Sequence, residues 1–165
     1  MAINEQEIQE IVRSVLKGMG TTAAAPAAPK APEKKLLGIF ETADEAIAAA
    51  KAAQKEIQPM PLEFREKIIA NIRKKTLENA KLLSELAVEE TGMGNVGHKI
   101  IKHQLVAEKT PGTEDLKTIA WSGDRGLTLT EMGPWGVIGA VCPSTNPTCT
   151  VICNSIGMLA AGNAV

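Results

Sequence analysis

The segment from residue 137 to residue 165 constrains the fold more than any other part of the sequence. It opens with VIGAVC (137–142), a continuous apolar run typical of parallel strands that are buried on both faces. A proline-bracketed turn (143–147) follows, and residues 148–161 have the pattern of a helix that ends at a glycine. Residues 163–165 begin another strand. Because parallel strands need a crossover connection, this order predicts an opening βαβ unit, and therefore an α/β fold.

The preceding hundred residues have mostly helical periodicity. We expect helices over about 45–57 with Thr42 or Asp44 as N-cap, over about 62–91, and over about 96–109. The length of the second helix suggests a break near Glu78 and Asn79, and Gly92 supplies the backbone freedom to end it. Residues 126–132, GLTLTEM, alternate in the manner of a half-buried strand.

Two segments precede this globular part. Residues 1–19 contain an amphipathic helix (3–19) with acidic residues early and basic residues late, which suits the helix dipole. Residues 20–35 form an Ala/Pro-rich linker that cannot pack a core. The helix either folds back onto its own domain or caps an oligomer, or it is a docking peptide for a groove on another protein. The domain prediction is therefore 1–19, 20–35 and 36–165.

Composition argues against several classes of protein. Lys and Arg number 18 against 19 Asp and Glu, and no basic stripe with interleaved aromatics suggests a nucleic-acid partner. No apolar run reaches the roughly 20 residues that span a bilayer. The amphipathic N-terminus is not a secretory signal. Three clustered cysteines form no disulfide framework, which indicates a cytoplasmic environment.

Cysteine and histidine spacings do not predict a metal site. Cys149 and Cys153, four apart on a helix, lack the partners of a zinc site, and small buried thiols are the expected state. Cys142 follows the apolar run with no base beside it, so we interpret it as structural as well. His98 and His103 are five apart and on different helix faces, so we expect solvated surface histidines. No metal is predicted.

The turn Pro143-Ser144-Thr145-Asn146-Pro147 is the candidate site. It follows a buried strand and precedes a helix, the position where α/β sheets bind ligands. Backbone N–H groups at such a helix end favour an anion or a developing oxyanion. The alternative is ordinary helix capping, with Asn146 as N-cap and Pro147 as first helical residue. Neither GxGxxG nor a P-loop occurs.

Several blocks together resemble the N-terminal part of the CoA-acylating aldehyde dehydrogenases, in particular the propionaldehyde and acetaldehyde dehydrogenases of bacterial microcompartments. The blocks are EETGMGN (89–95), TPGTEDL (110–116), GLTLTEMGPWGVIGAVCPSTNPT (126–148) and ICNSIGMLAAGNAV (152–165). The resemblance covers residues 36–165. The N-terminal helix and tether also resemble the encapsulation peptides of microcompartment enzymes.

The resemblance implies an NAD-binding α/β domain, here its N-terminal portion, with a catalytic domain and an oligomerisation arm elsewhere in the enzyme. The strand in 126–132 is a candidate for that arm. The implied reaction converts a short-chain aldehyde, NAD and coenzyme A to acyl-CoA and NADH through a cysteine thiolate and an oxyanion hole. The implied partners are the aldehyde, a shell protein bound through residues 3–19, and further copies of the enzyme. The implied location is the lumen of a cytoplasmic microcompartment.

Two departures from the family pattern bear on the site. Hydrolytic relatives have Pro-Trp-Asn-x-Pro at this turn, so Thr145 stands at their oxyanion-binding asparagine and Asn146 lies one residue later. Asn146 and Thr145 are therefore both candidates for oxyanion contacts, with Ser144 also open, and Pro143, Ser144 and Thr145 are the candidate cofactor contacts. Residues 95–99, NVGHK, replace an acidic stretch.

The family's nucleophilic cysteine is expected beyond residue 165, and none of the three cysteines matches its motif. We therefore expect a fragment of an acylating aldehyde dehydrogenase that is inactive alone. The alternative is a non-catalytic truncated paralogue that acts as an interaction or targeting module.

Overall fold

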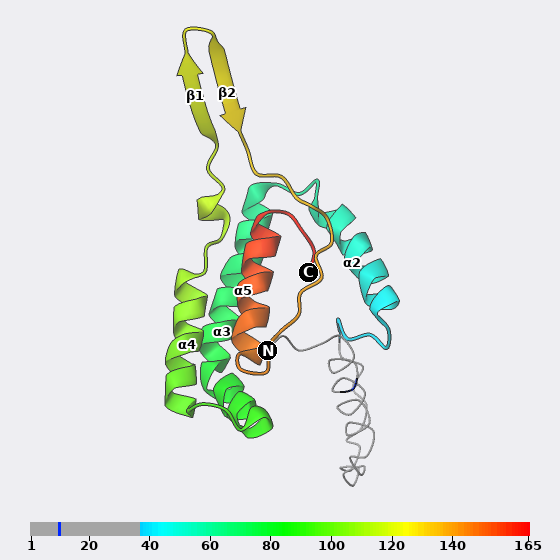
Figure 1. Cartoon of the computed structure of the whole chain (residues 1–165), viewed down its shortest axis with the longest axis vertical. Coiled ribbons are helices and arrows are strands. Elements are labelled where there is room, and N and C mark those ends of the chain that lie inside the picture. Colours follow the sequence, from blue (N-terminus) through cyan, green and yellow to red (C-terminus); the bar gives the residue numbers. More distant parts are fainter. Residues whose placement is uncertain (1–9, 11–36) are drawn as a thin grey trace. The chain divides into compact units, whose positions relative to one another are not determined.

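A computed structural model describes Glu10 and residues 37–165 (Figure 1). The chain divides into two units, Met1–Ile39 and Phe40–Val165, and all elements discussed below belong to the second. Of the expected docking helix only Glu10 is described, and it is helical and exposed. The docking and linker predictions therefore lie outside the described residues.

The first helix of the second unit is α2 (Ala43–Ile57), and its N-cap is Thr42 and not Asp44. The Thr42 hydroxyl accepts a hydrogen bond from the Glu45 backbone N–H at 3.3 Å, and the Glu45 carboxylate accepts one from the Thr42 N–H at 3.4 Å. This reciprocal pair satisfies two N–H groups that the helix start leaves without partners. The prediction of this helix is confirmed.

The second helix, α3 (Leu62–Thr91), is continuous over 30 residues, so the predicted break near Glu78 and Asn79 is wrong. Asn79 does not interrupt the backbone, because its side-chain amide donates to the Lys75 carbonyl at 2.8 Å. Lys75 also pairs with Glu78 at 2.8 Å. Gly92 ends the helix with a φ of 64°, a conformation that glycine adopts without a Cβ penalty.

Two further helices, α4 (Val96–Lys109) and α5 (Pro147–Ala160), pack against α3 and against each other (Figure 1). The core between α3 and α5 is aliphatic, with Ile69, Ile156 and Ala160 all buried. Buried alanines at 80, 87 and 107 allow close approach of the helices. The bounds of both helices lie within one residue of those expected.

Two arginines of α3 hold the C-terminal ends of its neighbours. Arg73 donates to the carbonyls of Ala107 and Thr110, each at 2.9 Å, where α4 ends. Arg65 donates to the Ala160 carbonyl at 2.6 Å, where α5 ends. Cationic donors at a helix C-terminus satisfy free carbonyls and oppose the negative end of the dipole. Both helices are thereby fixed antiparallel to α3.

Glu114, in the short 3₁₀ helix η1 (Thr113–Asp115), also pairs with Arg73. Its carboxylate lies 3.0 Å from the Arg73 guanidinium and accepts from the Gly112 N–H at 3.0 Å. Hydrogen bonds from its own backbone N–H, from Gly112 and from Arg73 hold the pKa of this carboxyl below its usual value. A Cβ at Gly112 would lie 2.7 Å from the Glu114 carboxylate, so a larger residue there would displace that carboxylate.

A two-stranded antiparallel hairpin projects away from the helices (Figure 1). Strand β1 (Ile119–Gly123) pairs with β2 (Gly126–Thr130), with Trp121 opposite Thr128. The strand at 126–130 is confirmed, but every residue of both strands is exposed, so the half-buried prediction is wrong. Leu127 and Leu129 alternate with polar residues along β2, as predicted. No other described segment covers the face of the hairpin that carries them. Strand β1 was not predicted.

The predicted buried strand at 137–142 is also corrected. A single parallel bridge forms, between Val137 and Ala164, with the Ile138 N–H donating to the Ala164 carbonyl at 2.9 Å. This is the first pair of the expected βαβ unit. Beyond it Val141 is 95% exposed, because no neighbouring strand lies on either side of it among the described residues. An apolar run indicates a buried strand only where sheet neighbours are present.

We predict that Arg73→Met lowers the free energy of unfolding by about 1–3 kcal/mol, because buried carbonyls at the end of α4 lose charged donors. Thermal and urea unfolding followed by circular dichroism measure it. Lys74→Met is the matched control, since the Lys74 side chain is 71% exposed and should change stability little. Equal stabilities of the two variants would contradict the role given to Arg73.

Candidate functional site

The turn before α5 is fixed by a backbone hydrogen bond and by a side chain from α4. The Asn146 N–H donates to the Pro143 carbonyl at 3.3 Å, which closes the turn. Asn146 occupies the N-cap position of α5, as expected, but makes no side-chain capping bond. Its Oδ1 instead accepts from Lys102 Nζ at 2.7 Å. Ordinary capping therefore does not account for this side chain.

A second lysine of α4 holds the same turn through its backbone. Lys99 Nζ donates to the Thr145 carbonyl at 3.2 Å. The residue is only 8% exposed, and its stem passes so close to Gly94 that a Cβ there would lie 3.2 Å from Lys99 Cε. Gly94 has a φ of 85° and forms part of the bend between α3 and α4. The lysine head group is therefore held at the turn.

These contacts enclose a pocket of about 310 Å³ between the N-terminal end of α4 and the turn. Its lining residues are Met93, Gly94, Asn95, His98, Lys99, Lys102, Thr145 and Asn146. The structure thus brings the predicted Thr145 and Asn146 together with two lysines, whereas Pro143 and Ser144 are exposed and outside this lining. The lysines were missed as site residues, although their i, i+3 spacing on one helix face was a usable signal.

His103 is the largest correction to the sequence reading. It is fully buried and not a solvated surface residue, and it contacts three elements. Its Nε2 lies 2.8 Å from the Thr148 hydroxyl of α5, and its Nδ1 lies 3.0 Å from the Ser84 hydroxyl of α3. His98 is exposed, as expected. His103 therefore holds Thr148 in the first turn of α5, two residues after Asn146.

The contacts of His103 determine which ring nitrogen carries the proton. The Ser84 hydroxyl donates to the Ala80 carbonyl at 2.7 Å, so towards His103 it can only accept. The Lys99 carbonyl, 2.8 Å from Nδ1, is also an acceptor. Both contacts need a proton on Nδ1, and Nε2 then accepts from the Thr148 hydroxyl. Every polar group of this buried network is satisfied.

The three cysteines lie in different environments. Cys149 is buried in the first turn of α5, as expected for a packing thiol, whereas Cys142 and Cys153 are exposed, contrary to expectation. Burial raises the pKa of the Cys149 thiol, while the ammonium groups of Lys102 and Lys99 act in the opposite direction. Cys142 is exposed because residues 137–142 lack strand neighbours among the described residues.

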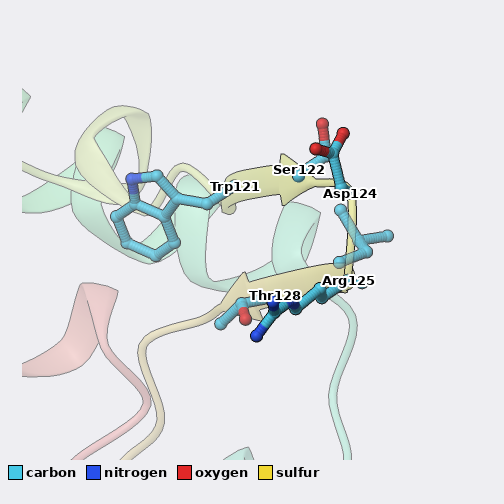
Figure 2. Close-up of a pocket in the computed structure, with 8 residues that line it drawn as sticks. Trp121, Ser122, Asp124, Arg125 and Thr128 are labelled. Atoms are coloured by element: carbon cyan, nitrogen blue, oxygen red, sulfur yellow. The ribbon is translucent and has the colours of Figure 1, made fainter.

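A larger hollow, of about 610 Å³, is lined only by the hairpin residues 121–128 (Figure 2). Trp121 lies on β1, Thr128 on β2, and Asp124 and Arg125 at the turn between the strands (Figure 2). We place the candidate site in the smaller pocket, because side chains from α4 and the turn before α5 converge there. A hollow formed by one exposed two-stranded ribbon lacks such walls.

Two classes of site find no support within the described ranges. The His, Cys, Asp and Glu side chains described do not gather into any group of three or more suited to a metal ion. Among the helices described, none has the length and apolar character needed to cross a membrane.

The sequence matches the model of the aldehyde dehydrogenase family over residues 37–165. It is 51% identical to an acetaldehyde dehydrogenase (acetylating) of Bilophila wadsworthia, covering 100% of this chain and 35% of that protein. It is 44% identical to a propanal dehydrogenase (CoA-propanoylating) of Salmonella typhimurium, covering 99% of this chain and 34% of that protein. The chain thus spans about a third of these relatives.

Solved structures give the same picture. A propionaldehyde dehydrogenase from the Clostridium phytofermentans fucose utilisation bacterial microcompartment is 68% identical, with a TM-score of 0.74 over 78% of this chain and 29% of that one. A Rhodopseudomonas palustris propionaldehyde dehydrogenase with bound coenzyme A and an acylated cysteine is 55% identical, with a TM-score of 0.73 over 76% of this chain and 29% of that one.

We predict that Thr148→Val destabilises the fold by about 1–3 kcal/mol, because it removes the hydroxyl that donates to His103 Nε2 and leaves a buried acceptor unsatisfied. Urea unfolding measures the loss. Thr150→Val, two residues along α5, is the matched control, because no side-chain hydrogen bond of Thr150 is present in the described part of the chain. If both variants unfold at the same urea concentration, the hydrogen bond between Thr148 and His103 does not stabilise the fold.

Proposed function

The chain belongs to the aldehyde dehydrogenase family, and we propose that it forms the N-terminal part of an NAD-dependent, CoA-acylating aldehyde dehydrogenase. The proposed reaction converts a short-chain aldehyde, propanal or acetaldehyde, to its acyl-CoA. The support is the similarity to acetylating and propanoylating relatives along nearly the whole chain. Those relatives are about three times as long as this chain, so the proposed activity is that of the longer protein.

The observation that carries the assignment of the oxyanion donor is the hydrogen bond from Lys102 to Asn146. A lysine ammonium can only donate, so the atom that faces it must be the Asn146 carbonyl oxygen Oδ1. The Asn146 Nδ2 group, with two donors, is then turned away from Lys102. It is the group we assign to the oxyanion that develops when a thiolate adds to the aldehyde carbonyl.

Thr145 takes a different role in this proposal. Its carbonyl is held by Lys99, so its backbone orients the turn while its hydroxyl stays available as a second donor. Between the two candidates we favour Asn146, because an amide fixed by a charged donor is also polarised towards donating more strongly.

The proposed cofactors are NAD, which accepts the hydride, and coenzyme A, which accepts the acyl group. The chemistry of the described residues fits such groups, since Pro143, Ser144 and Thr145 form an exposed turn beside two ammonium groups. Phosphate groups favour cationic side chains and helix N-termini. We assign Pro143, Ser144 and Thr145 to cofactor contact.

We also propose two protein partners. Residues 3–19 dock onto a microcompartment shell protein, which would place the enzyme in the microcompartment lumen. The hairpin β1–β2 takes part in a homo-oligomer, because a two-stranded ribbon with exposed Trp121, Leu127 and Leu129 is marginal in water without a covering surface.

The catalytic proposal is tested in a chimera in which residues 37–165 replace the matching segment of the Salmonella propanal dehydrogenase. We expect NADH formation from propanal, NAD and coenzyme A, and a fall in kcat of about 10²–10³-fold for Asn146→Ala. The 165-residue chain alone should produce no NADH.

Gln104→Ala in the same chimera is the control, because Gln104 is an exposed amide of α4 outside the pocket lining, and we expect its kcat to stay close to that of the unsubstituted chimera. A folded but inactive chimera would sink the proposed function. A fully active Asn146→Ala variant would refute only the role of Asn146.

The docking proposal predicts that deletion of residues 1–19 abolishes co-sedimentation of the chain with assembled shell protein. The amphipathic face supplies the contact, so Ile11→Glu in the intact chain should have the same effect. Gln9→Glu changes charge on the other face and serves as the control. Undiminished co-sedimentation after the deletion would overturn the proposal.

A further inference from the structure

Lys99 is a largely buried cation with no counter-charge among the described residues. Its residue is 92% removed from solvent, and its stem lies close to Gly94, so most of the side chain is covered by protein. The hydrogen bond described for this ammonium group goes to the neutral Thr145 carbonyl, which uses one of its three N–H donors. Lys99 also lines the pocket.

Lys102 brings a second positive charge to the same pocket. It lies three residues further along α4 and donates to another neutral acceptor, Asn146 Oδ1. The ion pairs of the described residues all lie elsewhere, at Arg73, Lys74, Lys75 and Lys81. The lining of the pocket contains no Asp or Glu.

The N-termini of α4 and α5 add to the positive electrostatic field of the two lysines. The contacts of Lys102 with Asn146 and of His103 with Thr148 show that α4 and α5 begin at the same end of the helical layer. The Asn95 side chain accepts from the His98 N–H, but Asn146 makes no such bond at the start of α5. Burial raises the pKa of the nearby Cys149 thiol, and the two ammonium groups act in the opposite direction.

Confined charges in folded proteins are normally paired, because an ammonium group removed from water loses hydration that only an opposite charge restores. Here two cations and the positive ends of two helix dipoles converge, and the described residues provide no anion. An anionic ligand in the pocket would supply the missing charge.

We propose that the pocket lined by Lys99, Lys102, His98 and Asn146 binds an oxyanion group. Its source is either a phosphate of the proposed cofactors NAD and coenzyme A, or a small carboxylate compound, a group that propanal and acetaldehyde lack. Only the choice between these sources rests on the proposed function, since binding itself needs no catalysis. Lys99 supplies the preorganised donors, and Lys102 contributes charge at the rim.

The first test titrates inorganic phosphate into the full 165-residue chain, with NMR detection of backbone amides at constant ionic strength. We expect saturable shifts at His98, Lys99, Thr145 and Asn146, and at least about tenfold weaker binding in Lys99→Met. Lys102→Met should weaken binding less, and because Lys102 is exposed this variant should keep the fold. Lys117→Met, an exposed lysine outside the pocket, is the control and should bind as the parent chain does.

Shifts that never saturate, or that sodium chloride reproduces at the same ionic strength, would overturn the proposal. So would unchanged phosphate affinity in both Lys99→Met and Lys102→Met, with circular dichroism showing both variants folded. The second test replaces phosphate by NAD, coenzyme A or succinate, and the compound that binds most tightly through the same residues identifies the source. These measurements do not involve turnover, so they stand or fall separately from the chimera's activity.

Discussion

The described structure depends on the way α3 holds the C-terminal ends of α4 and α5. Arg73 and Arg65 donate to carbonyls that the two helix ends leave without partners, at 2.6–2.9 Å. Because both helices are held at their C-terminal ends along α3, their N-terminal ends meet further along the same helix. Lys99 and Lys102 reach the Thr145–Asn146 turn as a consequence. The position of the site therefore depends on the hydrogen bonds that Arg73 and Arg65 make at the opposite, C-terminal ends of α4 and α5.

The buried His103 network secures the opposite ends of these helices. Ser84, His103 and Thr148 connect α3, α4 and α5 through hydrogen bonds of 2.8–3.0 Å. Such a network tolerates no partial loss, since an unsatisfied buried group is costly. It fixes Thr148 in the first turn of α5, two residues after Asn146, and so limits the positions that the Asn146 amide can take. Helix packing and the buried hydrogen bonds therefore both restrict the conformation of the turn before α5.

Most helices could be predicted from local signals. Thr42 with Glu45 forms a capping box, Gly92 has a left-handed φ, and Asn146 with Pro147 marks the start of α5, and each of these depends on residues close in sequence. The break predicted in α3 did not occur, because helix length alone is weak evidence and Asn79 bonds within the helix. Burial was predicted less well. Residues 137–142 and the hairpin are exposed because burial depends on neighbours that a local pattern does not specify.

The sequence by itself determined the helices, the turn, the opening of the βαβ unit and the resemblance to the acylating aldehyde dehydrogenases. These properties follow from capping, periodicity and motif order over short stretches of chain. Only the tertiary structure decided that His103 is buried, that Cys142 and Cys153 are exposed, and that two lysines of α4 hold Thr145 and Asn146. Those facts depend on contacts across 19 to 46 residues of sequence, which no local spacing encodes. The pocket and its charge arise from these contacts.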